Sequence, residues 1–309
     1  MDLLIQFLLL AAGFVMLIKG ADWFVDGASG IAAKFGIPQL VIGLTIVAMG
    51  TSAPEAAVSI SAAFSGNADI TIGNIVGSNI LNIFIILGVS SVITTLAVAK
   101  STIKYEIPFM TAITLLLLLL GLDGEIGLID GIILIAAFAL YMFYLFRMAK
   151  NNKEEQDAES EKKMGIAKAI IFTIIGLALI VLGSNVTVDA ATKIAEAFGV
   201  SERFIGLTIV ALGTSLPELF TSVSAARKGN AYIAIGNIVG SNIFNILFVV
   251  GISSVIIPVP FVSNFIFDTI VATIAAVMLL VCCLKTKTLK RWAGILMLIS
   301  YAAYFVCIL

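Results

Sequence analysis

Long runs of apolar residues, separated by short polar segments, dominate the pattern of the chain. A transmembrane helix needs about 20 mostly apolar residues, and ten stretches of this sequence meet or approach that length. The expected spans are residues 3–33, 37–64, 70–98, 105–121, 127–146, 166–197, 203–225, 231–257, 265–284 and 292–308. The pattern therefore predicts an all-α membrane protein with ten transmembrane helices, some of them long enough to be tilted or broken.

Residues 147–165 form the one long hydrophilic segment, between the fifth and sixth expected spans. They hold ten of the 37 acidic and basic residues and too few apolar residues to build a core, so we interpret them as a linker. Fifteen of the 18 lysines and arginines fall in connections that follow odd-numbered spans. Because basic residues favour the cytoplasmic side, we expect a multi-pass cell-membrane protein with a cytoplasmic linker and both termini outside.

The two halves of the chain are copies of each other. A shift of 163 residues aligns Gly36–Ser90 with Gly199–Ser253 without a gap, and 34 of those 55 positions are identical. We therefore expect a first five-helix repeat at residues 1–146 and a second at 166–309. Since five is an odd number, the second repeat should cross the membrane upside down relative to the first.

The most similar parts of the repeats, residues 43–82 and 206–245, each contain a sequence that interrupts a helix. Residues 50–55 are Gly-Thr-Ser-Ala-Pro-Glu, and residues 213–218 are Gly-Thr-Ser-Leu-Pro-Glu. Proline lacks the backbone N–H and glycine tolerates unusual backbone angles. Each span should break there, with proline at the first position of a new half-helix and the preceding Thr or Ser as its cap. The freed carbonyl groups need partners at membrane depth, and a cation is one such partner.

Glu55 and Glu218 are the two acidic residues near the middle of expected spans, whereas the others lie at span ends or in loops. An acid at a helix centre costs about 2.5–3.5 kcal/mol on insertion scales. Each glutamate could be protonated, or paired with a basic residue, but Lys19 is the one Lys or Arg inside an apolar span. Two equivalent carboxylates at two helix breaks favour a functional pair. Three further acids are assigned to the membrane interface: Asp22, Asp26 and Asp189.

A second motif, Gly-Asn-Ile-Val-Gly-Ser-Asn-Ile-x-Asn, occupies residues 73–82 and 236–245. Its serine and last asparagine are four positions apart and share one helical face. Singly, such residues often hold membrane helices together. Combined with two carboxylates, they offer hard oxygen donors, which suit Ca²⁺, Mg²⁺ and Na⁺ rather than zinc or copper, and a flexible mixture favours Ca²⁺ over Mg²⁺.

Composition excludes several other functions. With 61% hydrophobic and 12% charged residues the chain differs from soluble proteins. Its net charge of −1, without a basic face, argues against nucleic-acid binding. The absence of histidine excludes His-based zinc sites, Ser-His-Asp triads and imidazole relays. An intramembrane enzyme would have to use Ser52 with Glu55, or Ser215 with Glu218, without His or Lys. A channel is disfavoured because occluded broken helices indicate gated access.

At its two pairs of motifs the chain resembles the cation/calcium exchanger superfamily, in particular prokaryotic sodium/calcium exchangers. Hydropathy and the division into five plus five spans extend the resemblance over nearly the whole chain. It implies that the long first and sixth helices slide against the other eight, and that Na⁺ is exchanged for Ca²⁺ by alternating access. The implied partners are Ca²⁺, Na⁺ and the lipid bilayer, with no cofactor, and the oligomeric state stays open.

The resemblance also implies which residues bind the ions. For calcium they are Glu55, Glu218 and the carbonyls of Thr51 and Thr214. For sodium they are Ala48, Thr51, Ser52 and Ser78 in one half and Ala211, Thr214, Ser215 and Ser241 in the other, with Asn82 and Asn245 beside the centre. Some family members carry Asp at the position of Asn245, so Asn here argues against potassium coupling. The alternative function is a proton-coupled calcium/cation exchanger in which the same glutamates carry H⁺.

Overall fold

The structure, a computed structural model, describes residues 3–151, 164–200, 209 and 211–308. Within these residues eight helices are long and apolar enough to span a membrane, and a bent helix pair at Gln39–Phe64 makes a ninth candidate. These elements agree with nine of the ten spans expected from the sequence. The remaining span, 203–225, lies partly outside the described residues, so the expected count of ten is not tested in full.

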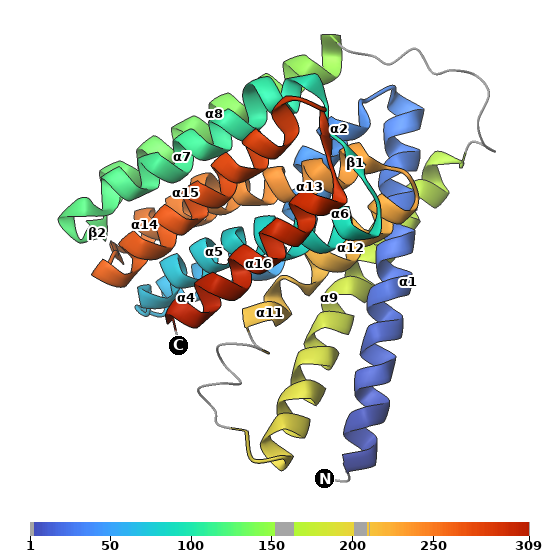
Figure 1. The fold of residues 1–309 in the computed structure, drawn as a ribbon, viewed down its shortest axis with the longest axis horizontal. Coiled ribbons are helices and arrows are strands. Elements are labelled where there is room, and N and C mark those ends of the chain that lie inside the picture. Colours follow the sequence, from blue (N-terminus) through green and yellow to red (C-terminus); the bar gives the residue numbers. More distant parts are fainter. Residues whose placement is uncertain (1–2, 152–163, 201–208, 210, 309) are drawn as a thin grey trace.

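Helices make up nearly all of the described chain (Figure 1). They are α1 Leu3–Phe35, α2 Gln39–Ile42, α3 Ala48–Thr51, α4 Ala53–Phe64, α5 Asp69–Leu81, α6 Gly88–Ile93, α7 Ile107–Leu120, α8 Leu128–Asn151, α9 Ile166–Ala197, α11 Ala211–Thr214, α12 Leu216–Arg227, α13 Ala231–Phe244, α14 Gly251–Ile256, α15 Ser263–Leu284 and α16 Arg291–Ile308. Short π-helical or 3₁₀ segments occur at Gly43–Val47, Asn82–Leu87, Thr102–Glu106, Gly121–Asp123 and Asn245–Val250. The strands are β1 Leu96–Ala97, β2 Glu125–Ile126, β3 Val259–Pro260 and β4 Thr288–Leu289. Neither the π-helical segments nor these strands are predicted by the pattern of apolar residues.

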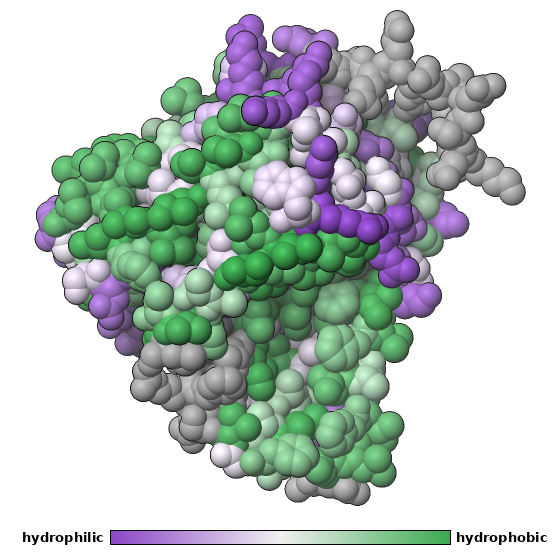
Figure 2. Space-filling model, in the orientation of Figure 1, coloured by the Kyte–Doolittle hydropathy of each residue, from purple (hydrophilic) through white to green (hydrophobic). Residues whose placement is uncertain are grey.

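Large apolar side chains cover the outside of the bundle. Leu140 on α8, for example, is 71% exposed. Apolar residues cover most of the face shown in Figure 2, and hydrophilic residues gather at its top, on its right side and at its left edge. A continuous apolar surface of this extent would be unfavourable in water and suits contact with lipid tails. The surface therefore agrees with a multi-pass membrane protein.

The centre of the bundle is formed by α5 and α13, which carry the second motif of each repeat. Every residue of α13 from Ile233 to Phe244 is buried. Several of these buried residues are Ser or Asn, although buried polar groups are unfavourable unless they have hydrogen-bond partners. The interior is therefore polar at the position where a soluble protein would have an apolar core.

Contacts between the two halves come in pairs related by the 163-residue shift. β1 pairs with β4 and β2 with β3, both antiparallel, and the shift relates β1 to β3 and β2 to β4. At the centre, Asn79 Nδ2 donates to the carbonyl of Asn242 at 3.3 Å, and Asn242 Nδ2 donates to the carbonyl of Asn79 at 3.2 Å. Reciprocal contacts of this kind are what a pseudo-two-fold axis produces, as expected for inverted repeats.

The two longest helices, α1 and α9, pack along each other and extend away from the other helices (Figure 1). Their closest approach depends on glycine, since a Cβ at Gly176 would lie 2.4 Å from the backbone nitrogen of Phe24. Small residues let membrane helices come this close. The pair therefore meets along its backbone, through glycines of both helices.

Candidate functional site

Both helix breaks expected from the sequence are present. The first interrupted helix bends by 50° between α3 and α4, at Ser52. The second break separates α11 from α12 at Ser215, which has nearly the same backbone angles as Ser52. Two local details differ from the prediction: Pro54 and Pro217 are the second residues of their half-helices, and neither serine side chain caps its helix.

Ser52 lacks the extended backbone typical of a capping residue, with φ −84° and ψ 7°, and its hydroxyl is used across the interface between the repeats. Its Oγ donates a 2.7 Å hydrogen bond to Oε1 of Glu218, which lies in the first turn of α12. Glu55 occupies the equivalent place in the first turn of α4. The break of one repeat therefore lies against the carboxylate of the other.

Both glutamate side chains are buried, each in a residue only 1% exposed. One oxygen of each, Oε2, has no hydrogen-bond partner. Among the described residues, no Lys or Arg, Lys19 included, lies within 4.0 Å of Glu55 or Glu218. The pairing with a basic residue that the sequence left open is therefore absent. An uncompensated buried charge is strongly unfavourable. A cation bound between the two carboxylates would neutralise their charge.

Two asparagine side chains add further acceptor oxygens. Asn82 Nδ2 donates to Asn242 Oδ1 at 2.8 Å, and Asn245 Nδ2 donates to Asn79 Oδ1 at 3.1 Å. These bonds fix the amide groups, while Oδ1 of Asn82 and of Asn245 stays buried and without a partner. Each of these two asparagines begins a π-helical segment, a feature frequent at functional sites.

Hydroxyl and carbonyl groups of the two repeats also meet. Ser241 Oγ donates to the carbonyl of Ala48 at 3.3 Å, and Thr51 Oγ1 lies 3.0 Å from Asn237 Oδ1, to which it donates. Asn237 in turn donates to Ser222 at 2.9 Å. The structure therefore brings three of the predicted sodium-site residues together: Ala48, Thr51 and Ser241.

The remaining predicted residues occupy matching elements. Ser78 is buried on α5, and Ser215 is buried with its hydroxyl unpartnered. Ala211 and Thr214 are the first and last residues of α11. Residues 201–208 and 210, which precede α11, lie outside the described residues.

Sequence reasoning did not assign three asparagines that position the site: Asn79, Asn242 and Asn237. Their signal was present, because all three lie in the second motif and recur under the 163-residue shift. From the motif alone they cannot be told from residues that only join helices. Their role depends on partners in the other repeat.

The arrangement offers oxygen acceptors of several kinds and no soft ligand. Unpartnered oxygens come from two carboxylates, two amides and one serine hydroxyl. Within the described residues there is no cluster of three or more His, Cys, Asp or Glu side chains that could hold a metal. A cation here would therefore be held by two carboxylates together with amide, hydroxyl and carbonyl oxygens, which suits Ca²⁺ or Na⁺.

Comparison with known proteins gives consistent matches over the whole length. Residues 5–147 and 168–309 match the family described as sodium/calcium exchanger protein. The chain is 37% identical to the sodium/calcium exchanger MaX1 of Methanosarcina acetivorans over 98% of each chain, and 34% identical to the inner membrane protein YrbG of Escherichia coli over 81% of this chain and 79% of the relative. A solved structure of the sodium–calcium exchanger NCX_Mj, soaked with Na⁺ and Sr²⁺, has a TM-score of 0.85 at 34% identity and covers 99% of each chain.

Proposed function

Because this chain belongs to the sodium/calcium exchanger family, we propose that it exchanges Na⁺ for Ca²⁺ across the cell membrane by alternating access. The observation that carries the proposal is the buried pair Glu55 and Glu218, which have no basic partner within the described residues and one free oxygen each. Two ionised carboxylates balance the charge of one divalent cation. A metal ion bound between them relieves the cost of burying both charges.

The ligands that we propose come from both repeats. Ca²⁺, which prefers about six to eight oxygen ligands, takes the carboxylates of Glu55 and Glu218 and the carbonyls of Thr51 and Thr214. The Na⁺ sites use these further residues: Ala48, Ser52, Ser78 and Asn82 in the first half, with Ala211, Ser215, Ser241 and Asn245 in the second. The contacts of Ser52 with Glu218 and of Ser241 with Ala48 support this assignment, because each joins groups of the two halves.

The charge of the site explains why the protein would exchange ions rather than let one ion pass alone. An empty site holds two negative charges that should not pass through a closed, dry intermediate, whereas a loaded site is neutralised. Only the loaded protein therefore changes its access, by movement of α1 and α9 against the other helices. With three Na⁺ for one Ca²⁺, one net charge moves per cycle, and the membrane potential contributes about 2.3 kcal/mol per 100 mV.

Reconstituted vesicles test this function directly. Purified protein in proteoliposomes loaded with Na⁺ is diluted into Na⁺-free medium containing radioactive Ca²⁺, and we expect uptake that stops when the Na⁺ gradient is removed. A second set of vesicles carries a pH gradient in place of the Na⁺ gradient. Uptake driven by pH and not by Na⁺ would reject the proposal in favour of proton coupling, and no uptake under either gradient would reject exchange altogether.

A further inference from the structure

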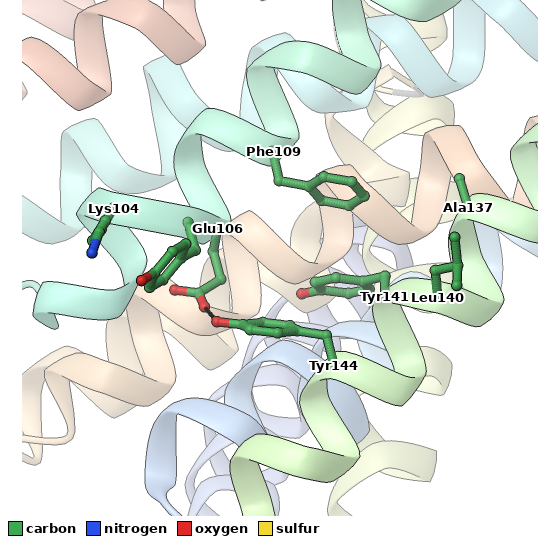
Figure 3. Close-up of a pocket in the computed structure, with 8 residues that line it drawn as sticks. Lys104, Glu106, Phe109, Ala137, Leu140, Tyr141 and Tyr144 are labelled. Atoms are coloured by element: carbon green, nitrogen blue, oxygen red, sulfur yellow. Dashed lines mark hydrogen bonds between the residues drawn. The ribbon is translucent and has the colours of Figure 1, made fainter.

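A pocket of about 400 Å³ lies between the start of the α7 span and α8 and involves none of the ion-site residues (Figure 3). Its outer rim includes Tyr105 and Leu140, which are 49% and 71% exposed on the apolar outer surface. The pocket therefore opens toward lipid. The sequence placed Glu106 at the edge of a span beginning at residue 105. In the structure helical residues begin earlier, at Lys100, and Glu106 is buried at the pocket.

The Glu106 carboxylate has one buried oxygen without a hydrogen-bond partner. Tyr144 donates its hydroxyl to Oε1 of Glu106, whereas Oε2 is buried and has no partner. The hydroxyl of Tyr141 points toward the same place and is also buried without a partner (Figure 3). No basic side chain of the described residues lies within 4.0 Å of Glu106. Lys104 lies instead over the ring of Tyr105, 5.0 Å from its centroid.

Aromatic rings line the pocket between its polar and apolar ends. Tyr141 stacks on Phe109 with ring centroids 5.5 Å apart, and the rings of Tyr141 and Tyr144 are 6.4 Å apart. Ring faces attract cations, especially where water is excluded. Beyond the rings, Ala137 and Leu140 continue an apolar wall along α8. A ligand with an ammonium group at one end and a hydrocarbon chain at the other matches this order of groups.

We propose that this pocket binds a phospholipid of the surrounding bilayer through a primary ammonium headgroup, as in phosphatidylethanolamine. The ammonium N–H groups donate to Glu106 Oε2 and Tyr141 Oη, and an acyl chain follows Ala137 and Leu140. A quaternary ammonium has no N–H to donate and leaves both acceptors unpaired, which is unfavourable for buried groups. The exposed Lys104 ammonium at the polar end suits the lipid phosphate.

A headgroup series tests the proposal on the wild-type protein. Delipidated exchanger in detergent is incubated with phosphatidylethanolamine, its mono- and dimethyl derivatives and phosphatidylcholine, all with the same acyl chains, and bound lipid is counted by native mass spectrometry. We expect retention of one lipid to fall with each methyl group, and to differ at least about fivefold between the two ends of the series. Equal retention across the series would overturn the proposal.

Three variants locate the binding. Glu106→Gln should lower phosphatidylethanolamine retention to the phosphatidylcholine level, and Tyr141→Phe, which keeps the ring, should give an intermediate loss. The matched control is Asp268→Asn in the other repeat, where a carboxylate accepts from Tyr304 at 2.9 Å and has no unpartnered buried oxygen. It should leave retention unchanged. Equal loss in all three variants, or stronger retention of an anionic lipid, would contradict a specific ammonium site. Because lipid is counted directly, the result does not depend on ion exchange.

Discussion

α12 and α4 occupy equivalent positions in the two repeats, yet they meet the long helices differently. Ser224 on α12 donates to Asp22 on α1 at 2.6 Å, and Lys228 donates to Asp26 at 2.6 Å. We refer to these four residues as the α1–α12 latch. In the described chain, α4 makes no comparably extensive contact with α9. The equivalent positions on α4 and α9 are all exposed: Ser61, Ser65, Asn185 and Asp189.

This difference shows how an inverted repeat can expose its site to one side at a time. If both repeats had the same conformation, the site would be equally accessible from both membrane faces. Here the latch holds the end of α12 against α1, while the end of α4 is not held against its long helix. With the orientation predicted from the basic residues, the latched end faces the cytoplasm. Because Lys228 corresponds to Ser65, the ionic part of the latch can form at one end only.

The centre of the molecule contrasts with these ends, because both repeats there supply the same groups. Asn79 and Asn242 exchange hydrogen bonds, and Asn82 and Asn245 bond to the other repeat in the same manner. The two halves therefore agree in these asparagine contacts. They differ in their contacts with the long helices, and also at the helix breaks, where Ser52 donates to Glu218 but the hydroxyl of Ser215 has no partner among the described residues.

The largest effect should come from the two carboxylates. Glu55→Gln and Glu218→Gln each remove one charge from a site that needs two, and we expect each to lower the initial rate of Na⁺-driven Ca²⁺ uptake by more than about 100-fold. The matched control is Glu125→Gln, an exposed glutamate in β2, which should transport as wild type does. Elution of each variant at the wild-type position in gel filtration checks its folding. Uptake above a tenth of the wild-type rate in either variant would refute the assigned role.

The next effect tests the symmetry of the centre. Asn79→Ala and Asn242→Ala each remove a donor and an acceptor and leave a buried amide of the other repeat unpaired, which costs about 1–3 kcal/mol. We expect similar decreases in the midpoint of thermal unfolding, followed in detergent. Asn230→Ala is the control, because its amide donates to Ser29 at the edge of the bundle and is only half-buried. A decrease in the unfolding midpoint of one central variant but not of the other would show that the two asparagines do not contribute equally to stability.

Features set by local sequence could be predicted, whereas features set by distant partners could not. Runs of apolar residues determined the spans, and Pro54 and Pro217 determined the breaks, because each acts through its own backbone. The capping role expected of Ser52 was wrong, because its backbone is not extended as in a capping residue, and its hydroxyl donates instead to a carboxylate 166 positions away. The π-helical segment at Asn82–Leu87 was missed, because one extra residue in a helical turn leaves no pattern in an apolar run.

The latch illustrates the same limit. Asp22 and Asp26 were assigned to the membrane interface one at a time, and their position near the end of a span gave that interpretation a sufficient reason. Lys228 was assigned to a cytoplasmic connection for a similar reason. Their pairing depends on the packing of α12 along α1, because Lys228 is 206 positions from Asp22 and 202 positions from Asp26 in the sequence. A candidate calcium site was easier to predict, because its glutamates occur at equivalent positions of both repeats.

The smallest effect should come from the latch. Its ion pairs are partly exposed, and such pairs contribute about 0.2–1 kcal/mol, so Lys228→Ala should raise amide hydrogen exchange at the end of α12 by up to about fivefold. Ser65→Ala, at the equivalent end of α4, should leave exchange unchanged. High salt should reduce the difference between wild type and Lys228→Ala, because it screens partly exposed charges. If both variants change exchange equally, or neither does, the two ends are held alike and the α1–α12 latch does not control access.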